Sequence, residues 1–231
     1  MNGMQRWVGT EAVAVAVAAM GAISGLCSPG LAQATATSTA ATPSFDCAKA
    51  SGEVETLICK DPQLAALDRK LDGVYKAASA KATGDMVALL KSEQRGWVKG
   101  RNDCWKANGN ETWITATWTV NTVRACVDAQ YRVRISELQS TWQLVPPKTV
   151  SYACNNNPAN EVIANHYATD PATIRLERGD RTVTLWQVGA PAAGKYEGQN
   201  VSAEKKADGS LQVSWLDVNT GKTDELACKP R

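Results

Sequence analysis

Two hydrophobic periods divide the chain, and the period changes at Pro146 and Pro147. Before these prolines, apolar residues recur at intervals of three and four, which is the spacing of one face of an α-helix. After them, apolar and polar residues alternate, which is typical of strands with one buried face. The pattern predicts an α+β protein in two domains, with a helical domain at residues 45–145 and an all-β domain at residues 148–231.

The helical domain is expected to contain three helices. Asp61 and Pro62 suit the cap and the first position of the first helix. Asp85 is expected to cap the second helix, and the third lies within residues 123–142. The apolar faces are Leu64, Leu67, Leu71 and Tyr75 in the first helix, Met86, Leu89, Leu90 and Trp97 in the second, and Val123, Val127, Tyr131, Ile135 and Leu138 in the third. Three amphipathic helices of this length form a small bundle.

The all-β domain is expected to contain seven or eight short antiparallel strands, arranged as a barrel or a sandwich. Val150, Tyr152 and Cys154 alternate with polar residues at its start. Leu211, Val213 and Trp215 alternate in the same way near its end. Glycine-containing turn sequences separate the alternating stretches, as hairpins require.

The first 34 residues are expected to be a signal peptide. A positive residue, Arg6, precedes an apolar run from Ala12 to Ile23, and Ala32-Gln33-Ala34 fits cleavage before Thr35. This apolar run is shorter than the about 20 residues that a membrane span needs, so it is expected to be a cleaved leader. No stable membrane insertion is expected after cleavage. Residues 35–44 contain only Ala, Thr, Ser and Pro, which indicates a flexible linker. A periplasmic or secreted protein is therefore expected.

Six cysteines are expected to form disulfides in the mature chain: Cys47, Cys59, Cys104, Cys126, Cys154 and Cys228. An even number of cysteines in an exported chain predicts such a framework. The seventh, Cys27, lies in the leader, and it follows Leu26 rather than the small residue that lipid attachment needs. A Cys154–Cys228 bond would join the first and last strands. The four helical cysteines allow three pairings, of which we favour the local pairs Cys47–Cys59 and Cys104–Cys126.

The composition offers little support for nucleic-acid binding or catalysis. The formal net charge is only +2, whereas phosphate binding needs a clustered basic surface. His166 is the only histidine, and no free cysteine is expected, so the common nucleophile–base pairs are absent from the sequence. No cofactor or metal site is predicted, and the protein is not expected to be an enzyme.

Motifs throughout the helical domain carry a resemblance to a known family. They are Asp46-Cys47-Ala48-Lys49-Ala50, Glu55, Ile58-Cys59, residues 61–68, Tyr75, Gln94-Arg95-Gly96-Trp97, Arg101-Asn102-Asp103-Cys104, Cys126, Tyr131, Arg134 and Leu138. With these motifs in register, residues 46–138 resemble the LprI-like family of bacterial envelope proteins, which is named for a lysozyme inhibitor.

A second set of motifs carries a resemblance in the all-β domain. They are residues 150–154, residues 183–185, residues 194–198, Trp215 with Gly221, and residues 226–228. Residues 148–231 resemble the MliC family, the membrane-bound inhibitors of c-type lysozyme, and the resemblance implies an eight-stranded β-barrel. It also implies that a Ser-Gly-x-x-Tyr loop and a nearby basic residue reach the two catalytic carboxyl groups of lysozyme.

Gly194, Lys195, Tyr196 and Lys222 are the candidate lysozyme-binding residues that this second resemblance supplies. The chain departs from the family pattern at Ala192 and Ala193, which stand where the family has Ser and Gly. Asn219 and Thr220 occupy the region of the family's basic residue, with Lys222 just beyond them. The fold inference survives these changes, whereas the inhibitory hydroxyl is lost.

The predicted function is that of an exported, non-enzymatic protein that binds and inhibits lysozyme, or a related peptidoglycan hydrolase, and so protects the cell wall. The absence of the Ser at Ala192 favours an alternative, an envelope module that binds another wall hydrolase or a wall fragment. An inhibitor of a basic enzyme gains association rate from an acidic face. Residues 44–147 carry a net charge of +2 and residues 148–231 a net charge of zero, so such a face requires a local patch.

Overall fold

A computed structural model describes residues 42–107, 113–115 and 118–231 of the protein. The predicted signal peptide, its cleavage site and most of the predicted linker lie outside these residues. Among the described residues, no helix has both the length and the apolar character needed to cross a bilayer.

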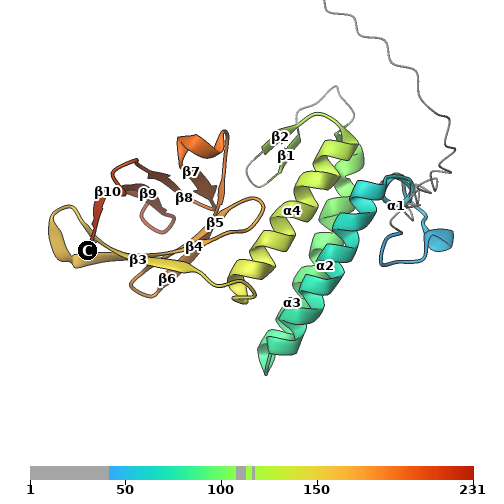
Figure 1. The fold of residues 1–231 in the computed structure, drawn as a ribbon, viewed down its shortest axis with the longest axis horizontal. Coiled ribbons are helices and arrows are strands. Elements are labelled where there is room, and N and C mark those ends of the chain that lie inside the picture. Colours follow the sequence, from blue (N-terminus) through green and yellow to red (C-terminus); the bar gives the residue numbers. More distant parts are fainter. Residues whose placement is uncertain (1–41, 108–112, 116–117) are drawn as a thin grey trace, which may run out of the picture. The chain divides into compact units, whose positions relative to one another are not determined.

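The helical part contains four α-helices in the described residues, where three were predicted (Figure 1). They are α1 Glu53–Lys60, α2 Pro62–Lys81, α3 Asp85–Asn102 and α4 Val123–Thr141. The prediction missed α1 because this helix is only eight residues long and buries only two of its side chains, Val54 and Ile58. A pattern that short does not distinguish a helix from a turn.

Asp61 ends α1 and begins α2. Its carboxylate accepts hydrogen bonds from the backbone N–H groups of Gln63 and Leu64 at 2.9 and 3.1 Å, and Pro62 occupies the first position of α2. Both choices stabilise a helix N-terminus, because they satisfy or remove donors that have no partner within the helix. The apolar faces of the four helices then meet in one buried cluster that includes Leu64, Leu71 and Ile135.

Short elements fill the rest of the helical part. A 3-10 helix, η1, covers Cys47–Lys49, and a second, η2, covers Asp103–Lys106. The segment between α3 and α4, which was expected to be a loop, contains a small antiparallel pair of strands, β1 Trp113–Thr115 and β2 Trp118–Val120.

The second part is a closed barrel of eight antiparallel strands, as the resemblance to MliC implied. Its strands are β3 Lys148–Cys154, β4 Asn157–Tyr167, β5 Thr173–Arg178, β6 Arg181–Gln187, β7 Lys195–Gly198, β8 Val201–Lys205, β9 Leu211–Asp217 and β10 Lys222–Pro230. Each strand pairs with the next, and β10 pairs with β3 to close the sheet. A third short helix, η3 Pro191–Ala193, lies between β6 and β7.

The barrel core follows the predicted alternation. Every second residue of β9, namely Leu211, Val213 and Trp215, is buried. The same holds for Val162 and Ala164 of β4. Inward residues from all eight strands therefore fill the barrel interior.

Three disulfides are present, and their pairing is the one that the sequence favoured: Cys47–Cys59, Cys104–Cys126 and Cys154–Cys228. The first joins η1 to α1, and the second joins η2 to α4. The third joins β3 to β10, at the seam where the barrel closes, because Cys154 and Cys228 are direct neighbours in the strand register.

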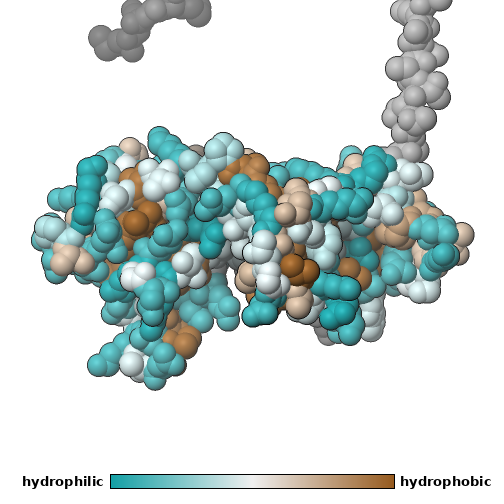
Figure 2. All heavy atoms as spheres, turned by 90° about the horizontal axis from the view of Figure 1, so that it is seen from below, coloured by the Kyte–Doolittle hydropathy of each residue, from teal (hydrophilic) through white to brown (hydrophobic). Residues whose placement is uncertain are grey.

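The helical part contacts the barrel through α4. The Trp186 indole N–H donates a hydrogen bond to the Ser136 hydroxyl at 3.0 Å, and Arg132 forms an ion pair with Asp170. The face drawn in Figure 2 shows hydrophobic residues in small separate groups among hydrophilic ones.

Candidate functional site

The predicted contact residues Gly194, Lys195 and Tyr196 lie where η3 leads into β7. The Lys195 side chain is exposed, whereas the Tyr196 ring is half-buried and packs against the barrel core. Burial raises the pKa of the Tyr196 hydroxyl, so this phenol stays neutral. Lys195 is therefore the more accessible of the two side chains for a partner.

Gly194 holds this segment against the neighbouring hairpin. Its φ is +62°, in the left-handed region that favours glycine. A Cβ atom at this position would lie 2.4 Å from the backbone oxygen of Lys205. The Lys205 N–H also donates a hydrogen bond to the Gly194 oxygen at 2.8 Å. Only glycine fits so close an approach of two backbones.

Lys222 lies away from the other predicted contact residues. In the strand register, Lys195 pairs with Glu204, and Glu204 pairs with Gln212 of β9. Lys222 pairs instead with Asp217 of β9. Gln212 and Asp217 are separated by about 17 Å of strand, at about 3.3 Å per residue. The structure thus places Lys222 toward the opposite end of the barrel strands.

Two further basic residues, Lys205 and Lys206, lie near Gly194, because the Lys205 backbone N–H donates a hydrogen bond to the Gly194 backbone oxygen. We call Gly194, Lys195, Tyr196, Lys205 and Lys206 the loop site. The sequence did not reveal this juxtaposition, because it depends on the register between β7 and β8.

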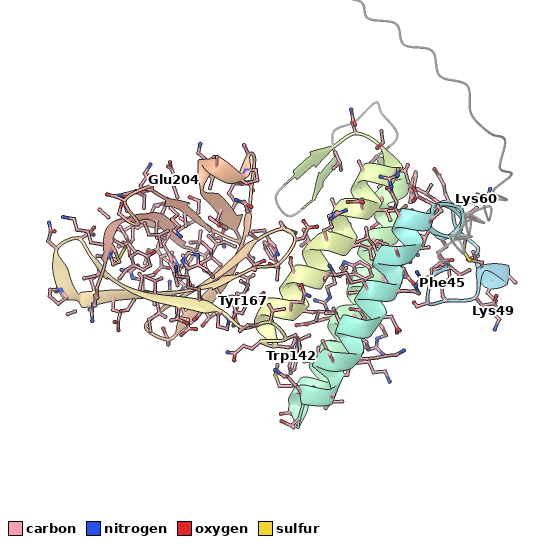
Figure 3. All side chains as sticks on the ribbon, viewed as in Figure 1. Phe45, Lys49, Lys60, Trp142, Tyr167 and Glu204 are labelled. Carbon is pink, nitrogen blue, oxygen red and sulfur yellow. A yellow bond between two sulfur atoms is a disulfide. The ribbon has the colours of Figure 1, made fainter. Side chains whose placement is uncertain are left out.

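An acidic hollow adjoins the loop site on the outer face of the barrel. Its volume is about 290 Å³, and its carboxylates come from β7, β8 and β10: Glu197, Glu204 and Glu225. Figure 3 labels Glu204. Lys206 lies 2.6 Å from Glu204 and lowers the pKa of that carboxyl through a hydrogen bond. This hollow is a local acidic patch of the kind that the net charges left open.

A second hollow lies in the helical part, and we call it the helical cavity. Its volume is about 410 Å³. It is bounded by the segment before α1, which carries Phe45 and Lys49 (Figure 3), and by helices α1, α2 and α3. Its lining residues are Ser44, Phe45, Asp46, Lys49, Glu55, Asp68, Leu71, Asp72, Tyr75, Gln94, Trp97, Val98 and Arg101. Most of these residues belong to the motifs that carry the LprI resemblance.

A chain of buried hydrogen bonds supports one wall of the helical cavity. The Arg101 guanidinium donates from Nη1 to the Tyr131 hydroxyl at 2.7 Å, and this hydroxyl donates to Asp68 Oδ1 at 2.8 Å. Ser44 donates to the other Asp68 oxygen from both its backbone N–H and its hydroxyl, each at 2.6 Å. Arg101 and Asp68 are 4% and 6% exposed, so the network fixes two buried charges.

Tyr131 stays protonated in this network. Burial, which is the largest effect, raises the pKa of the Tyr131 hydroxyl, and the neighbouring Asp68 carboxylate adds to the rise. A neutral hydroxyl can accept from Arg101 and donate to Asp68 at the same time. Arg101 also lies over the rings of Trp97 and Tyr131, at 5.5 and 5.6 Å from their centroids.

Within the described ranges, no group of three or more His, Cys, Asp and Glu residues is arranged to hold a metal ion. His166 lies on the same face of β4 as the buried Val162 and Ala164. Burial, followed by repulsion from Lys205 and Lys148, lowers the pKa of His166 to about 4. This histidine is neutral near pH 7.

The comparisons with known proteins agree with the first resemblance. Residues 47–138 match the family described as lysozyme inhibitor LprI. Proteins named lipoprotein LprI from Mycobacterium tuberculosis and Mycobacterium bovis are 26% identical to this chain over 200 residues, which is 85% of this chain and 88% of each relative. No solved structure gives a significant match.

The family match is confined to residues 47–138, within the helical part. The likeness to the mycobacterial proteins extends into the barrel, because 200 residues are far more than the helical part contains. The resemblance of the barrel to the MliC family stays a prediction.

Proposed function

We propose that this protein is exported and acts, without catalysing a reaction, by binding and inhibiting lysozyme, so that the cell wall is protected. The observation that carries the proposal is the LprI match over residues 47–138, since that family is described as a lysozyme inhibitor. The acidic hollow on the barrel gives a basic enzyme a complementary surface to meet.

The loop site is the contact that we propose on the barrel. Lys195 is exposed there, and Lys205 and Lys206 supply further positive charge. A cation placed between the two carboxyl groups of a lysozyme cleft would interact with both and exclude substrate. Lys222 belongs to this contact in the sequence prediction, but its position makes Lys205 and Lys206 the better candidates.

A clearance assay tests the proposed function. The mature chain, beginning at Thr35, is expected to suppress the lysis of a cell-wall suspension by at least one of the c-, g- and i-type lysozymes. Full activity of all three enzyme types at a several-fold molar excess of this protein would rule the proposal out.

The alternative is an envelope module that binds another wall hydrolase or a wall fragment. Ala192 favours it, because η3 exposes this residue where the MliC family has its inhibitory Ser. The double change Ala192→Ser and Ala193→Gly distinguishes the two functions. Inhibition that appears only in the double variant would show that the barrel kept the inhibitory geometry but serves another partner.

A further inference from the structure

The helical cavity combines opposite hydrogen-bonding characters in one small space. Four carboxylates from three segments line it, namely Asp46, Glu55, Asp68 and Asp72. The Arg101 guanidinium lines it as well, and 96% of this residue is buried, since its exposure is 4%. A ligand in this cavity therefore meets both acceptors and donors.

Arg101 has donor capacity left over. A guanidinium has five N–H groups, and those of Arg101 make three hydrogen bonds, two to Asn102 Oδ1 and one to the Tyr131 hydroxyl. Two N–H groups on the terminal nitrogens are without a hydrogen-bond partner among the described residues. Asp68 Oδ1, at 3.8 Å from Nη1, is beyond hydrogen-bonding distance. Buried donors of this kind favour a ligand that brings an oxygen acceptor.

The carboxylates retain acceptor capacity on the other side. Asp72 uses Oδ2 for an ion pair with Lys76 at 2.7 Å, and no hydrogen bond of its Oδ1 is found in the described part of the chain. Asp46 likewise uses Oδ1 to accept from the Ala48 N–H. A carboxylate oxygen has two lone pairs, so these side chains can accept from hydroxyl or amide groups of a ligand.

This mixture argues against a charged ligand. A cationic group would face the buried guanidinium of Arg101 and the Lys49 side chain. An anionic group would face the carboxylates of Asp46, Glu55, Asp68 and Asp72. A neutral ligand whose groups both donate and accept meets neither penalty. Phe45, Leu71, Tyr75 and Val98 add an apolar wall, which suits the C–H face of a pyranose ring or the methyl of an acetamido group. The volume of about 410 Å³ lies in the range of small-ligand sites.

We propose that the helical cavity binds a neutral, N-acetylated sugar unit of the bacterial wall glycan. The acetamido oxygen accepts from Arg101, the sugar hydroxyls donate to Asp46 and Asp72, and the ring packs against Tyr75. The hydrogen bonds through Tyr131 hold Arg101 and Asp68 in place before the ligand arrives, so little ordering accompanies binding. The site goes beyond lysozyme inhibition, because it holds the protein on the glycan that lysozyme attacks.

A titration without lysozyme tests this site separately from the proposed function. The probes are the trimer of N-acetylglucosamine, the disaccharide of N-acetylglucosamine and N-acetylmuramic acid with its lactyl carboxyl group amidated so that it is neutral, and the glucose trimer. Binding to the mature full chain is followed by heat and by the NMR signals of the Trp97 indole and of the Arg101 side chain. We expect both acetylated sugars to bind and to shift these signals, and the glucose trimer to bind at least about tenfold more weakly, since it lacks the acetamido acceptor.

A matched pair of variants locates the site. Asp72→Ala and Lys76→Ala break the same exposed ion pair, but only Asp72 lines the cavity. Asp72→Ala is expected to weaken binding of the acetylated trimer by about tenfold, whereas Lys76→Ala leaves it unchanged. Tyr75→Leu, checked for folding by circular dichroism, is expected to weaken binding as well.

Four outcomes would overturn the proposal. They are no binding of either acetylated sugar, equal binding of the glucose trimer, equal effects of the two ion-pair variants, and stronger binding of N-acetyl-lysine amide or of inorganic phosphate than of any sugar. Binding of the trimer without the wall disaccharide would overturn the assignment to the wall glycan. Loss of lysozyme inhibition has no bearing on these outcomes, because the enzyme is absent from the titration.

Discussion

At the scale of single residues, the Tyr131 hydroxyl links two buried charged side chains of the helical part, Arg101 and Asp68. It is the only atom that joins Arg101 to Asp68 by hydrogen bonds within the described structure, because these two charged groups are 3.8 Å apart. Buried charges whose hydrogen bonds are lost destabilise a fold more than exposed ones do.

Tyr131→Phe is therefore expected to lower the free energy of unfolding of the helical part by about 1–3 kcal/mol. Tyr75→Phe is the matched control, since no hydrogen bond of the Tyr75 hydroxyl is found among the described residues, and it is expected to change stability by less than about 0.5 kcal/mol. Urea titrations followed by far-ultraviolet circular dichroism measure both variants. Equal stability of the two variants would contradict the role of the network.

His166 gives the barrel a predictable dependence on pH. Its pKa is about 4 in the folded protein, below the ordinary value of about 6.5. Between these values the unfolded chain binds a proton that the folded chain does not, so stability falls as the pH falls from about 6.5 to about 4. The decrease in stability is complete below about pH 4, and the protein has its full stability from this group above about pH 7.

His166→Gln is expected to remove this part of the pH dependence. Each unit of difference between the folded and unfolded pKa corresponds to about 1.4 kcal/mol in the free energy of unfolding. Because His166 is partly exposed, we expect the variant to lose about 1–2 kcal/mol less stability on acidification than the wild type. Urea titrations at about pH 7.5 and about pH 5, followed by amide NMR signals of the barrel strands, measure it. If the free energy of unfolding changes with pH to the same extent in the variant and the wild type, His166 is not the titrating group.

At the scale of elements, the disulfides differ in the length of chain that they close. Cys154 and Cys228 are 74 residues apart, and Cys47 and Cys59 are 12 apart. In the loop-entropy model the longer closure is worth about 4 kcal/mol and the shorter one about 3 kcal/mol.

The double variant Cys154→Ala/Cys228→Ala is thus expected to destabilise the barrel by about 4 kcal/mol. The variant Cys47→Ala/Cys59→Ala is expected to leave the barrel unchanged and to destabilise only the helical part. Residue-resolved hydrogen exchange distinguishes the two parts. Equal exchange rates of the barrel amides with and without the Cys154–Cys228 disulfide would contradict its role in stabilising the barrel.

The approach of η3 and β7 to Lys205 gives a second prediction at this scale. Gly189 and Gly194 both have a left-handed φ, of +66° and +62°, but only Gly194 has a backbone atom within contact distance of a new Cβ. Gly189→Ala is expected to cost about 1 kcal/mol from the backbone conformation alone.

Gly194→Ala is expected to cost more than Gly189→Ala and to displace the end of β8, which the NMR shift of the Lys205 amide reports. If the loop site contacts lysozyme, Gly194→Ala also weakens inhibition while Gly189→Ala does not. Identical effects of the two changes on Lys205 would contradict the close approach.

Periodicity was enough to predict α2, α3, α4 and the alternating strands, although Asp85, the predicted cap, is the first residue of α3 and Gly84 is the N-cap. Asp61 and Pro62 marked a helix start that the structure contains. The sequence could not reveal α1, which buries only Val54 and Ile58, or the strand pair formed by Trp113–Thr115 and Trp118–Val120. Short elements depend on tertiary contacts more than on their own pattern.

The candidate sites were harder to predict than the elements. Lys222 was chosen because it lies just beyond the region of the MliC family's basic residue, whereas the strand register brings Lys205 to Gly194. The helical cavity draws residues from four segments, and Gln94, Trp97 and Arg101 could equally have formed a surface network. Only the three-dimensional structure shows that Arg101 is buried and that two of its N–H groups have no hydrogen-bond partner among the described residues.

At the scale of the whole molecule, the protein combines two parts that each offer a mixed or acidic hollow. The mycobacterial relatives match this chain over 85% of its length and 88% of their own. A protein that binds the wall glycan through its helical cavity could slow lysis by shielding the substrate, even without touching lysozyme. Wall clearance alone does not separate these two actions.

The formation of a complex between the purified mature chain and lysozyme, measured by calorimetry without any glycan present, tests the central claim most directly. We expect a saturable complex with at least one lysozyme type, weakened by added salt because the acidic hollow on the barrel meets a basic enzyme. The same molar ratio should abolish cleavage of a soluble glycan oligomer. The absence of heat and of a complex for c-, g- and i-type enzymes alike would contradict the account.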